Sequence, residues 1–148
     1  MKVVFMDPSH LDEVYAIETE SFYSPWSRKE LENELNNPFA IYVVVIEENR
    51  VIGYGGMWHV VTEGHITNIA VSQEERGKGY GRAILEEMIR LAYEKEMIGI
   101  TLEVRVSNLK AQKLYTSFGF KIEGYRKEYY ADTREDALIM WKHLGPAE

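Results

Sequence analysis

The sequence has 148 residues and 45% hydrophobic content, typical of one soluble globular domain, which we place at residues 1–148. It contains no cysteine, which excludes disulfides, thiol nucleophiles and thiolate metal sites, and its four scattered histidines lack metal-ligand spacing. A net charge of −7 argues against direct nucleic-acid binding, and the absence of a long apolar run or a signal-peptide pattern predicts a cytoplasmic protein without a membrane span.

The first part of the chain predicts one strand and two helices. A short apolar strand covers residues 2–6, and Asp7 followed by a proline is typical of a helix start. That helix runs to about Glu20. A second helix begins at the capping box of Ser27 and Glu30 and ends at an Asn-Asn-Pro segment.

An aromatic loop separates these two helices. Phe22, Tyr23 and Trp26 lie close together in a segment that also contains serine and proline. Two interpretations are equally supported. The loop is either a lid or wall of a substrate site, or a hydrophobic staple for the second helix.

The remaining elements follow from apolar segments separated by turn residues. Strands are predicted at residues 39–46, 51–61, 66–71, 98–104, 120–130 and 137–144, helices at 83–92 and 108–118, and a short tail after Leu144. Gly53, Gly55 and Gly56 indicate a bulge or a close approach within their strand. The order β-α-α-β-β-β-α-β-α-β-β predicts an α/β fold, with a mixed, mostly antiparallel sheet flanked by helices.

The segment Arg76-Gly77-Lys78-Gly79-Tyr80-Gly81-Arg82 lies between a predicted strand and a predicted helix. The first N–H groups of a helix lack internal partners, and the helix dipole adds partial positive charge there. Glycines let a ligand approach this backbone closely, which suits a phosphate or pyrophosphate. The spacing fits neither the Walker loop nor the dinucleotide fingerprint.

The pattern Arg76-x-x-Gly79-x-Gly81 resembles the pyrophosphate loop of the GNAT superfamily of N-acetyltransferases. The resemblance implies the GNAT acyl-CoA N-acyltransferase fold, in which two central strands diverge and acetyl-CoA lies in the gap against the free edge of one strand. It implies acetyl-CoA as cosubstrate and no metal. The cofactor-binding residues that it implies are Ile69, Ala70, Val71, Arg76, Gly77, Lys78, Gly79, Tyr80, Gly81, Arg82 and Asn108.

A second informative stretch runs from Leu102 to Phe120. From the residues alone, Glu103 is a carboxylate near the end of an apolar strand, either solvated or functional. Asn108 is by default a helix cap and Tyr115 a core residue. The stretch also closely resembles the L-E-V-R-x-S-N-x-x-A-x-x-L-Y-x-x-x-G-F signature of RimI-type ribosomal-protein alanine N-terminal acetyltransferases, and the resemblance extends over almost the whole chain.

This resemblance implies acetyl transfer to the N-terminal α-amine of a protein, by direct attack in a ternary complex. It implies Glu103 as proton acceptor and Tyr115 as proton donor. Glu103 suits that role if burial raises its pKa or if it acts through an ordered water. The implied acceptor is an alanine-starting ribosomal protein, and the residues considered for the acceptor opening are Glu20, Tyr129, Tyr130, Glu135 and Asp136.

Two other functions remain consistent with the sequence. One is a GNAT enzyme that acetylates lysine side chains or a small-molecule amine. The other is a non-catalytic acyl-CoA-binding module, which would have no need of the Glu103 and Tyr115 pair. The oligomeric state does not follow from the sequence.

Overall fold

A computed structural model describes residues 1–145 of the chain. Seven strands form one sheet in the order β1-β2-β3-β4-β5-β7-β6. Their bounds are β1 Lys2–Phe5, β2 Ala40–Glu47, β3 Arg50–Val60, β4 Glu63–Val71, β5 Gly99–Arg105, β6 Lys121–Tyr130 and β7 Glu135–His143. All neighbouring strands are antiparallel except β4 and β5, which are parallel.

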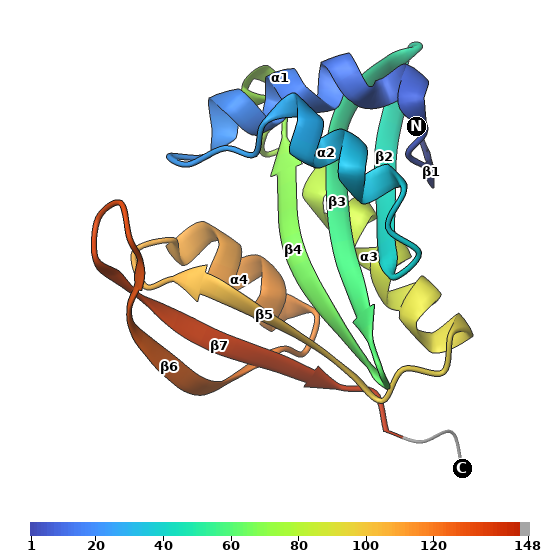
Figure 1. Cartoon of the computed structure of the whole chain (residues 1–148). Coiled ribbons are helices and arrows are strands. Elements are labelled where there is room, and N and C mark those ends of the chain that lie inside the picture. Colours follow the sequence, from blue (N-terminus) through green and yellow to red (C-terminus); the bar gives the residue numbers. More distant parts are fainter. Residues whose placement is uncertain (146–148) are drawn as a thin grey trace.

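Within residues 1–145, four α-helices cover the two faces of the sheet (Figure 1). Their bounds are α1 Leu11–Ser21, α2 Arg28–Leu35, α3 Tyr80–Glu94 and α4 Leu109–Ser117. Helices α1 and α2 lie on one face, and α3 and α4 lie on the other (Figure 1). No helix in the described part of the chain is both long enough and apolar enough to span a membrane.

The predicted order of elements and the mixed, mostly antiparallel sheet are confirmed. The differences are at the boundaries. Asp7 caps a 3-10 turn, Pro8–His10, that precedes α1, and β4 begins at Glu63, earlier than predicted. The capping box of Ser27 and Glu30 is present. The tail predicted after Leu144 lies, from residue 146 onward, outside the described residues.

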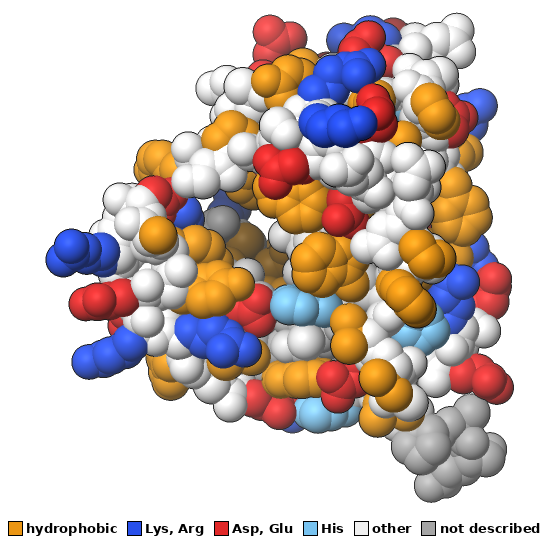
Figure 2. Space-filling model, in the orientation of Figure 1, with side chains coloured by type: hydrophobic (Ala, Val, Ile, Leu, Met, Phe, Trp, Pro, Cys, Tyr) orange, Lys and Arg blue, Asp and Glu red, His pale blue; other side chains and the backbone are white. Residues whose placement is uncertain are grey.

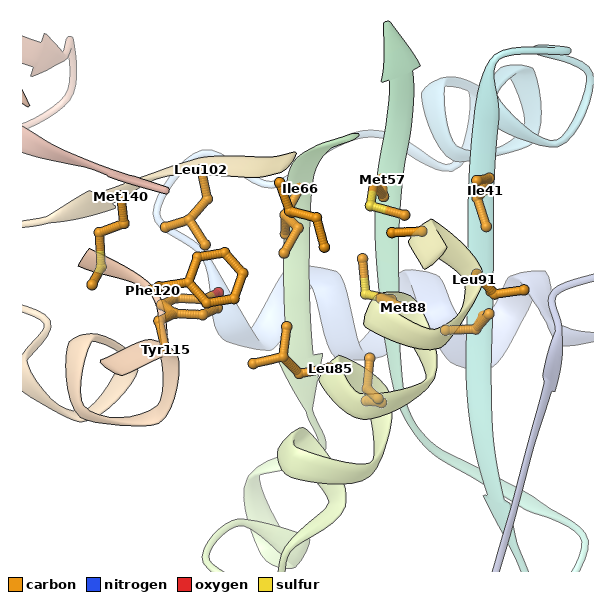
Figure 3. Close-up of a cluster of buried hydrophobic side chains, with 14 of the residues drawn as sticks. Ile41, Met57, Ile66, Leu85, Met88, Leu91, Leu102, Tyr115, Phe120 and Met140 are labelled. Atoms are coloured by element: carbon orange, nitrogen blue, oxygen red, sulfur yellow. The ribbon is translucent and has the colours of Figure 1, made fainter. Parts of the chain in front are cut away.

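The core is divided by the sheet into two clusters. The larger one joins the inner side of α3 to β2, β3, β5, β7 and α4, and Figure 3 shows part of it. The inner face of α3 is apolar, since Ile84, Leu85, Met88, Leu91 and Ala92 are all buried. The smaller cluster packs α1 and α2 against the other face of β2 and β3.

The glycines of β3 mark both features expected of them. Gly53 lies so close to the neighbouring strand that an added Cβ would be 2.8 Å from the carbonyl oxygen of Ala70. A Cβ on Gly55 would be 2.8 Å from the sulfur of Met88 in α3. The register between β3 and β4 shifts directly after Gly56.

The sheet opens close to this register shift. Gly56 pairs with Asn68 and Met57 pairs with Ile66, so Thr67 is one extra residue in β4. A bulge bends its strand and changes the face to which the following side chains point. Strands β4 and β5 pair only from Glu63 to His65, and beyond that point they spread apart (Figure 1).

Candidate active site

The space between β4 and β5 contains two adjoining cavities of about 850 and 360 Å³. Ser21, Phe22, Ile69, Asn108 and Ala111 line both of them. Figure 2 shows a hollow on the face where the strands separate. The divergence of two central strands, which the resemblance implied, is therefore present.

The smaller cavity gathers most of the residues predicted to bind a cofactor. These are Ile69, Ala70, Val71, Arg76, Gly77, Gly79, Tyr80, Gly81 and Asn108. Lys78 and Arg82 do not line it. Lys78 pairs with Glu75 at 2.9 Å, and Arg82 donates to Ser117 and lies over the ring of Phe118.

The glycine segment has the backbone geometry that its sequence demands. Gly77 and Gly79 adopt φ values of 81° and 91°, where side chains other than glycine are strained. Gly79 is the N-cap of α3 and provides no side-chain cap, so the first N–H groups of the helix face the cavity region without an internal partner. Arg76 fixes the segment by donating to the carbonyl of Val71 and to Ser21.

This geometry fits acetyl-CoA. Uncapped N–H groups at a helix start suit a pyrophosphate. The unpaired edge of β4 from Ile66 onward offers hydrogen-bonding groups to an extended chain that contains amides. Within residues 1–145, no three His, Cys, Asp or Glu side chains are grouped as metal ligands would be.

The Glu103 carboxylate lies in the larger cavity and is 10% exposed. Its Oε1 atom is 2.9 Å from Nε2 of His65 and accepts from the Tyr129 hydroxyl at 3.3 Å. The hydrogen bond from His65 is the main cause that lowers the pKa of Glu103, with Arg126 assisting, although burial acts in the opposite direction. Of the two conditions under which Glu103 was expected to act as proton acceptor, a pKa raised by burial is therefore not met.

The Tyr115 side chain extends from α4 into the larger cavity and packs on Phe120 (Figure 3). Burial raises its pKa well above the ordinary value of 10.0, so the hydroxyl keeps its proton at neutral pH. No hydrogen bond joins this hydroxyl to residues 1–145, yet none of their side-chain N or O atoms is fully buried without a partner. The hydroxyl is therefore accessible from the cavity.

The aromatic loop between α1 and α2 is a wall of the larger cavity. Phe22, Tyr23 and Trp26 all line it, as do Tyr129 and Tyr130 from the opposite side. A shift in register between Arg126 and Tyr130 lets the end of β6 bulge, which brings Tyr129 over Glu103.

The other residues considered for the acceptor opening are engaged elsewhere. Glu20 accepts from the backbone of Gln73, Glu135 from that of Ser107, and Asp136 from that of Glu128. Asn108 does cap α4, since its side chain accepts from the N–H of Ala111.

A bridge of polar and aromatic contacts closes one side of the larger cavity. Arg105, at the end of β5, donates to Asp132 at 2.9 Å and to Thr133 at 3.0 Å. Its guanidinium lies 3.9 Å from the ring centre of Tyr130 and 5.1 Å from that of Tyr23. These contacts, here called the rim bridge, join the α1–α2 loop to the β6–β7 loop.

Sequence reasoning misses three side chains of this site. His65 resembles an ordinary strand residue, and no spacing in the sequence connects it with Glu103. Glu18 is predicted only as part of a helix, although it is buried and lines the larger cavity. Arg105 is the fixed arginine of the quoted signature, and its place in that signature is the signal that could have identified it as a site residue.

Residues 11–120 match the Acetyltransferase (GNAT) family. The chain therefore belongs to this family, in agreement with the fold and with the divergent strands. A Bacillus subtilis relative, whose name proposes a ribosomal protein bS18-alanine N-acetyltransferase, is 46% identical over 132 residues, which are 88% of this chain and 87% of the relative.

Two solved structures extend the comparison. The crystal structure of the Escherichia coli ribosomal-protein-S18-alanine N-acetyltransferase superposes with a TM-score of 0.91 at 30% identity, covering 99% of this chain and 96% of that one. An aminoglycoside 6′-N-acetyltransferase complexed with coenzyme A has a TM-score of 0.85 at 16% identity, covering 100% and 99% of the two chains. The second likeness concerns the fold alone.

Proposed function

We propose that the protein is an acetyl-CoA-dependent N-acetyltransferase that modifies the N-terminal α-amine of a protein. The observation that carries the proposal is the shared cavity of Glu103 and Tyr115, which adjoins the cavity lined by the glycine segment. A proton acceptor and a proton donor thus lie beside the place where an acyl-CoA fits. A binding module would have no use for this pair.

The residues divide the work of the reaction. When bound, acetyl-CoA supplies an acetyl group activated as a thioester. The amine attacks the acetyl group directly, which agrees with the absence of cysteine, since no thiol-bound acyl-enzyme can form. The protonated Tyr115 hydroxyl is available to the departing thiolate, which needs little assistance because a thiol has an ordinary pKa of about 8.5.

Glu103 accepts the proton that the amine loses, directly or through an ordered water. A carboxylate with a lowered pKa is a weak base, so the acceptor amine must be one that loses its proton easily. His65 orients this carboxylate and is itself 33% exposed, which gives the proton a route to solvent.

The acidity of the amine favours an α-amine over lysine. With ordinary pKa values of about 7.8 and 10.4, roughly a tenth of α-amines but well under a thousandth of lysines are neutral at pH 7. The rim bridge adds a steric reason. A cavity closed on one side by Arg105, Tyr23 and Tyr130 receives a chain end more readily than a side chain on a continuous chain.

The names of the relatives support a particular acceptor. Both the Bacillus and the Escherichia coli proteins are named as ribosomal protein bS18-alanine N-acetyltransferases, the former as a proposed one. We extend that acceptor class to this chain: an alanine-starting ribosomal protein, acetylated in the cytoplasm without direct binding of nucleic acid.

The test is mass spectrometry after incubation with acetyl-CoA and a peptide that offers both a free alanine N-terminus and an internal lysine. We expect one acetyl group on the α-amine, with turnover sharply reduced in Glu103→Gln and Tyr115→Phe. Label on lysine alone would contradict the N-terminal assignment. Full activity of both variants would contradict the assigned roles.

A further inference from the structure

A network of buried hydrogen bonds lies beneath the acceptor side of the larger cavity. At its centre is Glu18 of α1, which is 2% exposed and is the one buried charged side chain among residues 1–145. Its carboxylate accepts from three donors on three elements: the Tyr54 hydroxyl of β3, Asn68 Nδ2 of β4 at 3.0 Å, and the backbone N–H of Trp26 at 2.9 Å.

The network extends to the bulge that opens the sheet. Thr67 is the extra residue of β4, and its hydroxyl donates to Oδ1 of Asn68 at 2.8 Å. The Tyr42 hydroxyl lies 3.2 Å from the same Thr67 oxygen. A continuous chain of hydrogen bonds therefore joins the bulge, through Asn68 and Glu18, to the aromatic loop.

The two oxygens of Glu18 accept hydrogen bonds from different parts of the network. Oε1 accepts from Tyr54 and Asn68, within the sheet, whereas Oε2 accepts from Trp26, in the loop. No cation is among these three partners, so the carboxylate depends on donated hydrogen bonds. Because a buried acceptor or donor without a partner is costly, the loop is held at the position where all three bonds form.

We propose that Glu18 is the positioning residue that fixes the aromatic loop against the β4 bulge and thereby sets the affinity for the acceptor. The inference rests on the proposed function, because the loop is taken as the acceptor wall. Glu18, Trp26, Thr67 and Asn68 all line the larger cavity, and none of them lines the smaller one. Phe22 of the same loop lines both cavities, but its backbone is not among the partners of Glu18, so the network bears chiefly on the acceptor side.

The variant Glu18→Gln tests the network with almost no change in shape. An amide has one acceptor and one donor, so a glutamine that accepts from Trp26 turns its NH₂ group toward the NH₂ group of Asn68. Two donors then face each other, and turning the Asn68 amide over to avoid this loses the hydrogen bond that Asn68 accepts from the Thr67 hydroxyl. If the glutamine amide is turned the other way, its NH₂ group faces the backbone N–H of Trp26, and that hydrogen bond is lost. We expect the KM for the acceptor peptide to rise about tenfold, with the KM for acetyl-CoA unchanged.

The double variant E18Q/N68D exchanges the amide and the carboxylate. The new carboxylate at position 68 can accept from the new amide at position 18, while that amide accepts from Trp26, so the count of donors and acceptors is restored. The acceptor KM should return toward the wild-type value. Hydrogen exchange supplies a readout that does not depend on activity: the Trp26 amide should exchange faster in E18Q and regain its protection in E18Q/N68D.

Glu13→Gln is the matched control. Glu13 also lies on α1 and also accepts from a backbone N–H, that of Val51 at 2.9 Å, but it lines neither cavity. The Glu13→Gln variant should leave the acceptor KM and the hydrogen-exchange rate of the Trp26 amide unchanged.

The outcomes separate the two proposals. A wild-type protein that acetylates no peptide α-amine contradicts the proposed function. An active wild type whose E18Q variant keeps its acceptor KM, or raises both KM values equally, overturns the inference alone. If E18Q does not fold, the double variant E18Q/N68D provides the test instead. A wild-type acceptor KM in E18Q/N68D supports the inference, and a raised acceptor KM overturns it.

Discussion

Alanine substitutions at Gly79 and Gly81 should have opposite effects on the free energy of unfolding, although the two positions are only two residues apart. Gly79 has φ of 91°, and a Cβ added there meets nothing within 4 Å. The variant Gly79→Ala therefore introduces backbone strain without a clash. For a residue with a side chain, this region costs about 1–2 kcal/mol.

Gly81 is the contrasting position two residues later. It lies in the first turn of α3 and has no positive φ, and an added Cβ would make ordinary contacts at 3.7 Å with Leu114 and 3.9 Å with Val71. Alanine is favoured over glycine within a helix by roughly 0.5–1 kcal/mol. The two variants should therefore differ by about 2 kcal/mol in free energy of unfolding.

Urea denaturation measures this difference. With a slope of about 1–3 kcal/mol per molar urea, the midpoints of Gly79→Ala and Gly81→Ala should lie roughly 1 M apart. Calorimetry with CoA adds a second comparison. Gly79 and Gly81 both line the smaller cavity, so both alanine variants should bind CoA more weakly than the wild type, Gly81→Ala although it is the more stable of the two variants. Equal midpoints, or a lower midpoint for Gly81→Ala, would refute the reasoning.

Three further predictions concern the larger cavity. Tyr115→Phe should lower kcat by about 10²-fold, the low end for a general acid because a thiolate needs little assistance. CoA affinity and the urea midpoint should stay almost unchanged, because the hydroxyl has no partner to lose among the described residues; a large fall in the midpoint would contradict its accessible position. Glu103 has a pKa held below its ordinary value of 4.5, mainly by the His65 hydrogen bond, so its contribution to stability is present above the unfolded pKa and is lost as pH falls through the folded pKa. Unfolding measured against pH should show this as a difference between wild type and Glu103→Gln, and His65→Asn should reduce that difference. Arg105→Gln should open the rim bridge and raise the ratio of lysine to α-amine acetylation in the mixed peptide, whereas Arg90→Gln, which removes a surface ion-pair arginine of α3, should not change the ratio.

The fold followed closely from local patterns in the sequence. Helix caps such as Ser27 and Glu30, and the apolar face of α3, are encoded within a few residues, so their recognition does not need the rest of the chain. The resemblance to the GNAT superfamily then predicted the divergent strands. The start of β4 differs from the prediction because its pairing with β5, far along the chain, helps to define it. The 3-10 turn after Asp7 differs although its cap is local, because the same capping signal also precedes an α-helix.

The site was predictable where a single segment supplies it. The glycine segment and the stretch from Glu103 to Tyr115 are each continuous in sequence. His65 and Glu103 are 38 residues apart, and Glu18 and Asn68 are 50 apart, so their contacts depend on strand register. A one-residue change in register, such as the bulge at Thr67, changes which side chains share a face, and composition carries no sign of it.

The unpaired edge of β4 has a consequence for self-association. An exposed strand edge is a template for pairing with another chain, and proteins protect such edges with charges, bulges or covering loops. Here the edge from Ile66 to Val71 faces the space between β4 and β5, and the rim bridge joins two loops that line the same cavity as part of this edge. The contacts proposed to shape the acceptor opening would therefore also restrict the access of another chain to this edge, so that Arg105 would serve both the proposed choice of acceptor and the protection of the sheet.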